Sequence, residues 1–124
     1  MLDTIRRVFV VEDETLVLFN LEDILAELGC QVVGPAMRLD EAERLAGSIQ
    51  APDAAILDVN IGGRFVFPAA DILAERGVPL IFATGYGREG LPAQWQDCEV
   101  IAKPYTRDDV AGALKRLESR VLPG

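Results

Sequence analysis

The chain has 124 residues, of which half are apolar, and its 20 acidic and 12 basic residues give a net charge of −8. This length predicts one domain over residues 1–124, and the negative charge disfavours nucleic acid and anionic membranes as direct partners. The sequence contains no histidine, which excludes a Ser-His-Asp or Cys-His catalytic system and a histidine-based metal site.

Short apolar segments rich in valine and isoleucine alternate along the chain with segments of helical periodicity. Such alternation is typical of repeated strand–helix units around a parallel sheet. With right-handed crossovers it predicts an α/β three-layer sandwich of the flavodoxin-like type, with a five-stranded sheet of order 2-1-3-4-5 and helices on both faces. The predicted strands are Ile5–Val11, Gln31–Pro35, Ala54–Leu57, Leu80–Ala83 and Cys98–Ala102.

The first two helices are predicted between these strands from apolar residues at helical spacing. We expect Gly29 to end the first helix and Asp40 to be the N-cap of the second. The apolar positions are Val17, Leu21, Ile24 and Leu28 in the first helix, and Ala42, Leu45, Ala46 and Ile49 in the second.

The later helices have clearer start signals, with one exception. Pro68 suits the first turn of a helix that runs to Gly77, and the hydroxyl of Thr106 is expected to cap the last helix. The segment Gly85–Gln96 holds three glycines and one proline, so a fourth helix there should be short or irregular. The apolar positions are Ile72 and Leu73 in the former helix, and Val110, Leu114, Leu117 and Val121 in the last.

Membrane and redox signals are weak in this sequence. No apolar run is long enough to span a bilayer and the N-terminus lacks a signal-peptide pattern, so we expect a cytoplasmic protein. Cys30 and Cys98 lie within apolar segments, which favours two buried thiols over a disulfide.

Polar residues follow four of the predicted strands. Glu12-Asp13 follows the first strand, Asp58 the third, Thr84 the fourth and Lys103-Pro104 the fifth. The carboxyl ends of parallel strands meet at one edge of a sheet, so these side chains are expected to surround one crevice.

The residue types at this edge indicate phosphoryl chemistry. The clustered carboxylates of Glu12, Asp13 and Asp58 should recruit a cation, and a site of oxygen ligands without histidine or cysteine favours Mg²⁺. Mg²⁺ normally takes only one or two carboxylates, which leaves Asp58 free to attack phosphorus as a nucleophile. Lys103 and Thr84 would then contact the phosphoryl group as a cation and a hydrogen-bond donor.

At these residues the sequence resembles the receiver domains of response regulators in two-component signalling, over essentially the whole chain. Pro79 and the run Phe82–Gly87 further resemble the hallmark of the single-domain group nicknamed FAT GUY. Members of that group are found largely in alphaproteobacteria, often in general stress signalling. The resemblance implies a signalling protein rather than an enzyme, with Mg²⁺-dependent phosphorylation and dephosphorylation of its own aspartate.

The resemblance also implies a role for each residue. Asp13 would bind Mg²⁺ directly, Glu12 directly or through water, and the main-chain carbonyl of Asn60 would be the third protein ligand. Asp58 would accept phosphate from a kinase histidine or a small acyl phosphate. Thr84 and Lys103 would move onto the phosphoryl group.

The implied partners are proteins. They are a sensor histidine kinase of the HWE and related classes or a histidine phosphotransfer protein, and a downstream protein partner. Neither nucleic acid nor a membrane is expected to bind directly. The chain is expected to be a monomer or a weak dimer.

One departure from the family pattern concerns the switch. Receivers usually carry Phe or Tyr three positions before the lysine, but Val100 stands there. We hypothesise that Tyr86 supplies the ring instead, with Gly85 and Gly87 lending mobility.

Other functional interpretations fit the sequence less well. A receiver-like protein-binding module that is never phosphorylated is the main alternative. A phosphatase of the haloacid dehalogenase type would need a second aspartate where Asn60 stands, and a flavodoxin would need a hydroxyl-rich loop in place of the acids after the first strand. Gly62-Gly63 is interpreted as an ordinary flexible turn, and the aromatic residues Phe65, Phe67 and Trp95 are interpreted as packing residues.

Overall fold

A central sheet of five parallel strands organises the computed structural model, which describes residues 2–121 apart from the side chain of Val121. The strand order is β2-β1-β3-β6-β7, which is 2-1-3-4-5 when the strands of this sheet alone are numbered. This confirms the predicted flavodoxin-like topology. The strands are β1 (Arg7–Val11), β2 (Gln31–Ala36), β3 (Ala54–Asp58), β6 (Leu80–Thr84) and β7 (Glu99–Ala102).

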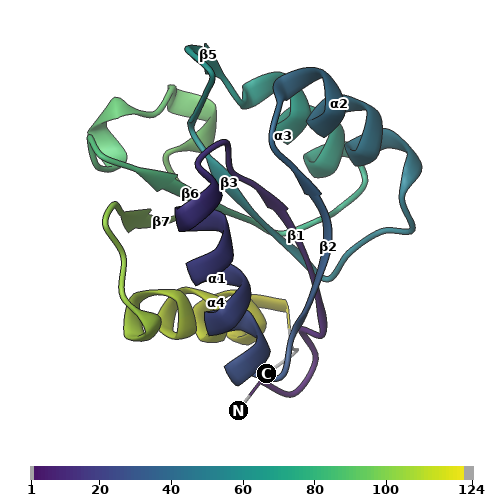
Figure 1. The fold of residues 1–124 in the computed structure, drawn as a ribbon, viewed down its shortest axis with the longest axis vertical. Helices are drawn as coiled ribbons and strands as arrows, with labels where there is room; N and C mark the ends of the chain where they lie inside the picture. The colour runs from purple at the N-terminus through teal and green to yellow at the C-terminus, as the bar shows by residue number, and fades with distance from the viewer. Residues whose placement is uncertain (1, 122–124) are drawn as a thin grey trace.

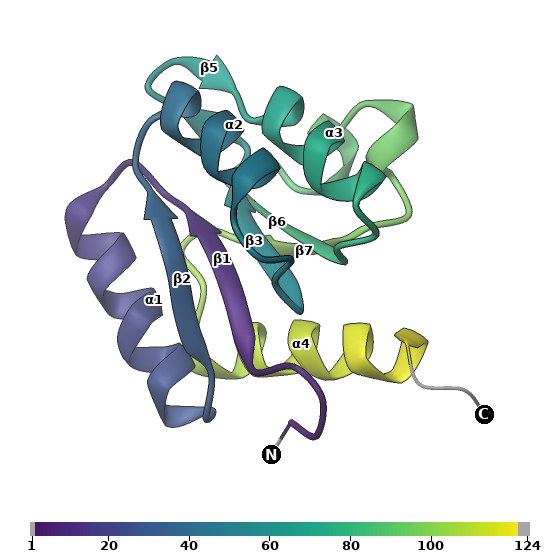
Figure 2. The same cartoon turned by 90° about the vertical axis from the view of Figure 1, so that its right-hand side faces the viewer.

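Helices cover both faces of the sheet, with α1 and α4 on one face and α2 and α3 on the other (Figures 1 and 2). Successive strand residues point to opposite faces. Val8 and Val10 therefore pack toward α1 and α4, whereas Phe9 and Val11 pack toward α2 and α3. The helices are α1 (Thr15–Glu27), α2 (Leu39–Ser48), α3 (Phe67–Glu75) and α4 (Arg107–Val121).

The predicted helix ends are confirmed with one correction. Gly29 follows the end of α1 with a φ of 83°, and Pro68 lies in the first turn of α3. The Thr106 hydroxyl accepts a hydrogen bond from the amide of Asp109 at the start of α4. Asp40 is not the N-cap of α2, because that position is Arg38. Asp40 lies inside the first turn, where a carboxylate is still favoured by the helix dipole.

The side chain of Val121, predicted to lie on the apolar face of the last helix, is outside the part of the chain that the structure describes.

Two segments near the carboxyl edge of the sheet depart from simple strand–helix alternation. The predicted irregular fourth helix is confirmed: the chain between β6 and β7 forms two short 3₁₀ turns, Arg88–Gly90 and Ala93–Trp95. The second segment was not predicted. Directly after β3, the strands β4 (Asn60–Ile61) and β5 (Arg64–Phe65) form a small antiparallel hairpin.

The hairpin confirms Gly62-Gly63 as a turn and defines its conformation. These glycines form its tight turn, with φ of 59° and 84°, a conformation that side chains other than glycine adopt at a cost. Gly62-Gly63 is therefore a defined turn next to β3, not merely a flexible one.

Both cysteines are free thiols, and only Cys30 is fully buried, whereas Cys98 is half-buried. Within residues 2–121 no helix is long and apolar enough to cross a membrane.

Candidate phosphoryl-transfer site

The parallel sheet brings the polar residues after β1, β3, β6 and β7 to one edge. In the register of the sheet, β1 pairs with β3, β3 with β6 and β6 with β7. Glu12, Asp58 and Thr84 are 2%, 6% and 4% exposed. The strand ends therefore hold two carboxylates and a hydroxyl almost out of contact with bulk water.

Lys103 links the two buried carboxylates. Its Nζ lies 2.8 Å from Asp58 Oδ2 and 3.4 Å from Glu12 Oε1. Its main-chain amide also donates to the carbonyl of Thr84 at 3.0 Å, which ties the end of β7 to the end of β6. The lysine is thus held by its backbone as well as by its charge.

The buried carboxylates of Glu12 and Asp58 share one lysine, so their negative charge is not fully balanced. The pKa of Glu12 is raised to about 7, chiefly by burial and also by the charge of Asp58, although the hydrogen bond from the Glu14 amide and the charge of Lys103 act to lower it. Burial by itself lowers the pKa of Lys103, but the hydrogen bond and charge of Asp58, together with the charge of Glu12, outweigh burial and raise it. A site in which crowded acids share one lysine favours a further cation.

Asp13 completes the acidic cluster. Glu12, Asp13 and Asp58 each offer a carboxylate oxygen within 4.8 Å of those of the other two. Asp13 Oδ2 also accepts a hydrogen bond of 2.9 Å from the amide of Gly62, at the tip of the β4–β5 hairpin. The donor set consists of hard oxygen atoms, as Mg²⁺ requires, so the residues present fit that ion.

Asn60 holds the start of the hairpin. Its amide donates to Asp58 Oδ1 at 3.2 Å, and its side-chain oxygen accepts from the amide of Gly63 at 3.0 Å. The residue predicted to contribute a main-chain ligand is therefore in direct contact with the predicted acceptor. The contact of Gly62 with Asp13 could not be read from the sequence, because a glycine pair carries no signal of what its amides contact.

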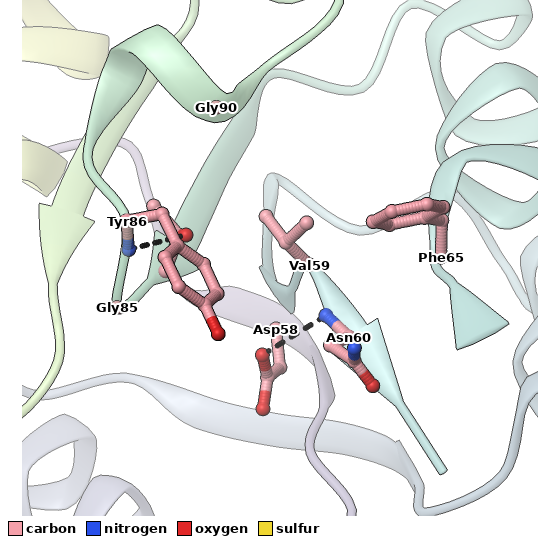
Figure 3. Close-up of a pocket in the computed structure, with 8 residues that line it drawn as sticks. Asp58, Val59, Asn60, Phe65, Gly85, Tyr86 and Gly90 are labelled. Atoms are coloured by element: carbon pink, nitrogen blue, oxygen red, sulfur yellow. Dashed lines mark hydrogen bonds between the residues drawn. The ribbon is translucent and has the colours of Figure 1, made fainter. Parts of the chain in front are cut away.

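A cavity of about 510 Å³ opens beside Asp58 (Figure 3). Tyr86 and Phe65 lie on opposite sides of it, and Val59 and Asn60 lie between them. Tyr86 is 87% exposed and Phe65 is 63% exposed, so the predicted packing role of Phe65 is limited to its stacking on Phe67. Both rings are accessible at the mouth of the site.

Thr84 is connected to the glycine-rich segment that follows β6. Its hydroxyl accepts a 3.1 Å hydrogen bond from the amide of Tyr86. Gly87 has a φ of 74°, which favours glycine at that position. Val100 pairs with Phe82 in the sheet and packs with the apolar cluster under α3.

A second cavity of about 430 Å³ lies on the other side of Lys103, lined by the start of α1 and by Tyr105. Tyr105 is buried, and burial raises the pKa of its hydroxyl, as do the charges of Glu12 and Asp58. Tyr105 was not among the predicted site residues. Its place two residues after Lys103 is the only sequence signal that could have found it.

No family model matches the chain, but the chain is similar in sequence and in fold to known proteins. The solution structure of SdrG from Sphingomonas melonis Fr1 is 38% identical, with a TM-score of 0.78, and the match covers 93% of this chain and 98% of SdrG. The transcriptional regulatory protein PdtaR of Mycobacterium tuberculosis is 33% identical, over 93% of this chain and 58% of PdtaR. The chain spans about half the length of the curated relatives it matches.

More distant structures share the fold. The receiver domain of the sensor histidine kinase PA1611 from Pseudomonas aeruginosa PAO1 has a TM-score of 0.75 at 23% identity, over 94% of this chain and 99% of that domain. That structure has a magnesium ion coordinated in its active site cleft. Response regulator receivers from other bacteria match with TM-scores of 0.77 and 0.78 at 18% and 21% identity.

Proposed function

The chain belongs to the response regulator receiver family, and on that premise we propose that it is a signalling switch in which Asp58 accepts a phosphoryl group from a phosphohistidine. One observation carries the proposal. Lys103 Nζ contacts both Asp58 and Glu12 at the mouth of a cavity, with Asp13 in the same cluster. The proposed nucleophile Asp58, the cation Lys103 and the proposed metal ligands therefore lie within one site.

The proposed transfer is a displacement at phosphorus. An oxygen of Asp58 forms the new P–O bond, the P–N bond to the donor histidine breaks, and the histidine leaves with that electron pair and takes up a proton. Lys103 balances the negative charge that the phosphoryl oxygens bring beside Asp58. The hydroxyl of Thr84 accepts from the Tyr86 amide and keeps its own proton free to donate to a phosphoryl oxygen.

We propose that Glu12, Asp13, Asp58 and the main-chain carbonyl of Asn60 hold Mg²⁺. When bound, the ion neutralises the charge on the phosphoryl oxygens and orients them for attack. The fit is supported by the three clustered carboxylates and by the absence of histidine from the sequence. Glu12 is the least exposed of these acids, with its Oε2 already accepting from the Glu14 amide at 3.0 Å.

The signal would leave the site through Thr84 and the residues after it. If the hydroxyl of Thr84 moves toward a phosphoryl group, the amide of Tyr86 is drawn with it, because the two are hydrogen-bonded. Gly85 and Gly87 flank Tyr86 and give the backbone freedom to follow. We propose that this movement presents the exposed ring of Tyr86 to a downstream protein partner.

The phosphoryl donor would approach over α1. Leu16 and Phe19 are 82% and 56% exposed, and their spacing of three residues places them on one side of the helix. Leu16 lines the cavity that also contains Lys103. We propose that this apolar surface contacts a sensor histidine kinase, of the HWE and related classes by resemblance to the FAT GUY group, or a histidine phosphotransfer protein.

The test uses the purified chain, acetyl phosphate and intact-mass spectrometry. The wild type should gain one phosphoryl group only when Mg²⁺ is present, and Asp58→Asn should gain none. Asp97→Asn, which changes an exposed aspartate, is the matched control and should behave as the wild type. An undiminished gain on Asp58→Asn would reject the proposed acceptor.

The alternative, a binding module that is never phosphorylated, makes a different prediction. It requires that neither acetyl phosphate nor a phosphorylated histidine kinase labels the wild type. The paired Lys103 and Asp58 favour the switch, because a pure binding module has no need of a lysine held against a buried aspartate.

A further inference from the structure

The β4–β5 hairpin contacts the acidic cluster at two points. The Gly62 amide at its tip donates to Asp13 Oδ2, and the Asn60 amide at its base donates to Asp58 Oδ1. The side chain of Asn60 closes the turn by accepting from the Gly63 amide. Two carboxylates of the proposed metal site are therefore positioned by the main chain of one short, closed hairpin.

The same hairpin leads into a row of stacked aromatic rings. Phe65, at its end, stacks on Phe67 with ring centroids 5.6 Å apart, and Phe67 stacks on Trp95 at 6.3 Å. Phe67 and Trp95 each form a T-shaped pair with Phe82, with ring centroids 5.9 and 5.4 Å apart. Trp95 lies in the second 3₁₀ turn between β6 and β7, so the row connects the hairpin to the segment that follows Thr84.

This row lies where the usual switch residue is missing. Val100 pairs with Phe82 in the sheet register, and both belong to the apolar cluster that contains Trp95 and Phe67. A valine offers no ring that could rotate. On this side of the sheet the aromatic rings come instead from Phe65 and Phe67, which follow β3, and from Trp95, which follows β6.

We propose that the β4–β5 hairpin and the row Phe65–Phe67–Trp95 transmit occupancy of the acidic cluster to residues 85–98. The inference rests on the proposed function, since it assigns a route for regulation of the same site. A cation that takes oxygen atoms of Asp13 and Asp58 competes with, or reorients, their hydrogen bonds to Gly62 and Asn60. Because the hairpin is closed on itself, it shifts as a unit and moves Phe65.

The receiving segment is suited to respond. Its 3₁₀ turns have fewer and poorer hydrogen bonds than an α-helix would. Its surface residues include Gly85, Tyr86 and Gly90, which line the same cavity as Phe65. Side-chain hydrogen bonds from Arg88 to the Cys98 carbonyl and from Gln96 to the Arg88 and Leu91 carbonyls link this segment internally. A displacement of Trp95 is therefore passed along a segment that is adjacent to the site.

The experiment compares wild type with Phe65→Leu and Phe67→Leu, which remove a ring but keep an apolar side chain. Hydrogen exchange of residues 85–98 is measured with and without Mg²⁺ and beryllofluoride. Phosphorylation by acetyl phosphate is measured in parallel. Trp95 is the only tryptophan, so its fluorescence gives a second readout of the row in the wild type.

We expect Mg²⁺ and beryllofluoride to slow exchange of residues 85–98 in the wild type and to shift the emission of Trp95. Phe67→Leu, whose ring does not line the cavity beside Asp58, should be phosphorylated at the wild-type rate. Both leucine variants should lose most of the exchange response of residues 91–98, whereas residues 85–87, which are linked to Thr84, should keep theirs. Phe67→Tyr, which keeps the ring, should restore the response of residues 91–98. Ile72→Ala, which trims a half-buried side chain elsewhere on α3, controls for destabilisation of that helix and should respond as the wild type.

Phe65 is mostly exposed, so Phe65→Leu should fold even if Phe67→Leu does not. The inference is overturned if the leucine variants keep the wild-type exchange response of residues 91–98. It is also overturned if the wild type is phosphorylated while residues 91–98 do not respond. A wild type that is neither phosphorylated nor able to bind Mg²⁺ by calorimetry would instead remove the proposed function, and this inference with it.

Discussion

Lys103 donates a 2.8 Å hydrogen bond from Nζ to Oδ2 of Asp58. The same ammonium group lies 3.4 Å from Glu12, so one lysine serves as counterion to two buried acids. Any cation or phosphoryl group that enters the site must share or replace these contacts. Lys103 should therefore affect metal binding and phosphorylation in opposite directions.

Lys103→Gln should bind Mg²⁺ more tightly than the wild type, because the acidic cluster loses the cation that competes for it. Phosphorylation of Asp58 by acetyl phosphate at saturating Mg²⁺ should slow by roughly 100-fold, the size of effect expected when one charge-stabilising group is lost. Calorimetry measures the Mg²⁺ affinity and intact-mass spectrometry measures the rate.

Lys115→Gln is the control for that substitution, because it removes the same charge from an exposed position on α4. It should leave both quantities unchanged. Weaker Mg²⁺ binding by Lys103→Gln would show that the lysine organises the metal ligands rather than competing with the ion.

The site residues that could be predicted from the sequence are those placed by the topology of the sheet. Glu12, Asp58, Thr84 and Lys103 come together because each follows a buried apolar strand, and strand ends of a parallel sheet meet at one edge. That pattern is visible in the chain itself. It places residues by topology, without any need to know side-chain packing.

The parts that escaped prediction depend on contacts that carry no periodic signal. The β4–β5 hairpin has strands of two residues each, too short to show alternation. Its amide contact with Asp13 is made by a glycine, and the exposure of Phe65 depends on how the hairpin is oriented. The N-cap of α2 was predicted two residues late, at Asp40 instead of Arg38, because acidic residues are also favoured inside the first turn.

Substitution of Tyr86 can distinguish phosphorylation of Asp58 from the proposed binding of a downstream partner. Tyr86→Ala removes an exposed ring but leaves the backbone amide that donates to Thr84. Phosphorylation by acetyl phosphate should therefore be unchanged, whereas binding of the phosphorylated chain to its downstream partner should be lost. Tyr86→Phe keeps the ring and should bind. Partner capture with the beryllofluoride-activated chain checks this, and unchanged binding by Tyr86→Ala would defeat the proposed role.

The surface of α1 can be tested by comparing two phosphoryl donors. Phe19→Glu places a charge in the apolar surface proposed to contact the kinase, so transfer from phosphorylated histidine kinases of the same genome should slow by about tenfold or more. Transfer from acetyl phosphate, which needs no protein surface, should not change. Radiolabel transfer assays compare the two donors.

Ala26→Glu adds the same charge at an exposed position near the end of α1, and it should transfer normally from both donors. Equal slowing by Ala26→Glu and Phe19→Glu would mean that net charge, and not the apolar surface, controls the kinase reaction.

Glu118 links α4 to residues 3–5 near the N-terminus. Its carboxylate makes the stability of the fold depend on pH, separately from the site. Its Oε2 accepts hydrogen bonds from the amides of Asp3, Thr4 and Ile5 and from the Thr4 hydroxyl. The Asp3 and Thr4 amides are the main cause that lowers the pKa of Glu118 from 4.5 to about 2. A carboxylate whose pKa is lower in the folded state stabilises the fold above its unfolded-state pKa, and this contribution is lost as the pH falls through the folded-state value.

Glu118→Gln should therefore lower the free energy of unfolding at pH 7 by about 1.5–3 kcal/mol, the range for hydrogen bonds to a charged group. The difference between variant and wild type should persist down to about pH 4.5 and shrink from there toward pH 2. Urea unfolding at a series of pH values measures it. Glu75→Gln, at an exposed position at the end of α3, should show little difference at any pH. A deficit for Glu118→Gln that stays constant down to pH 3 would mean that packing, and not the charge of Glu118, stabilises the N-terminal segment.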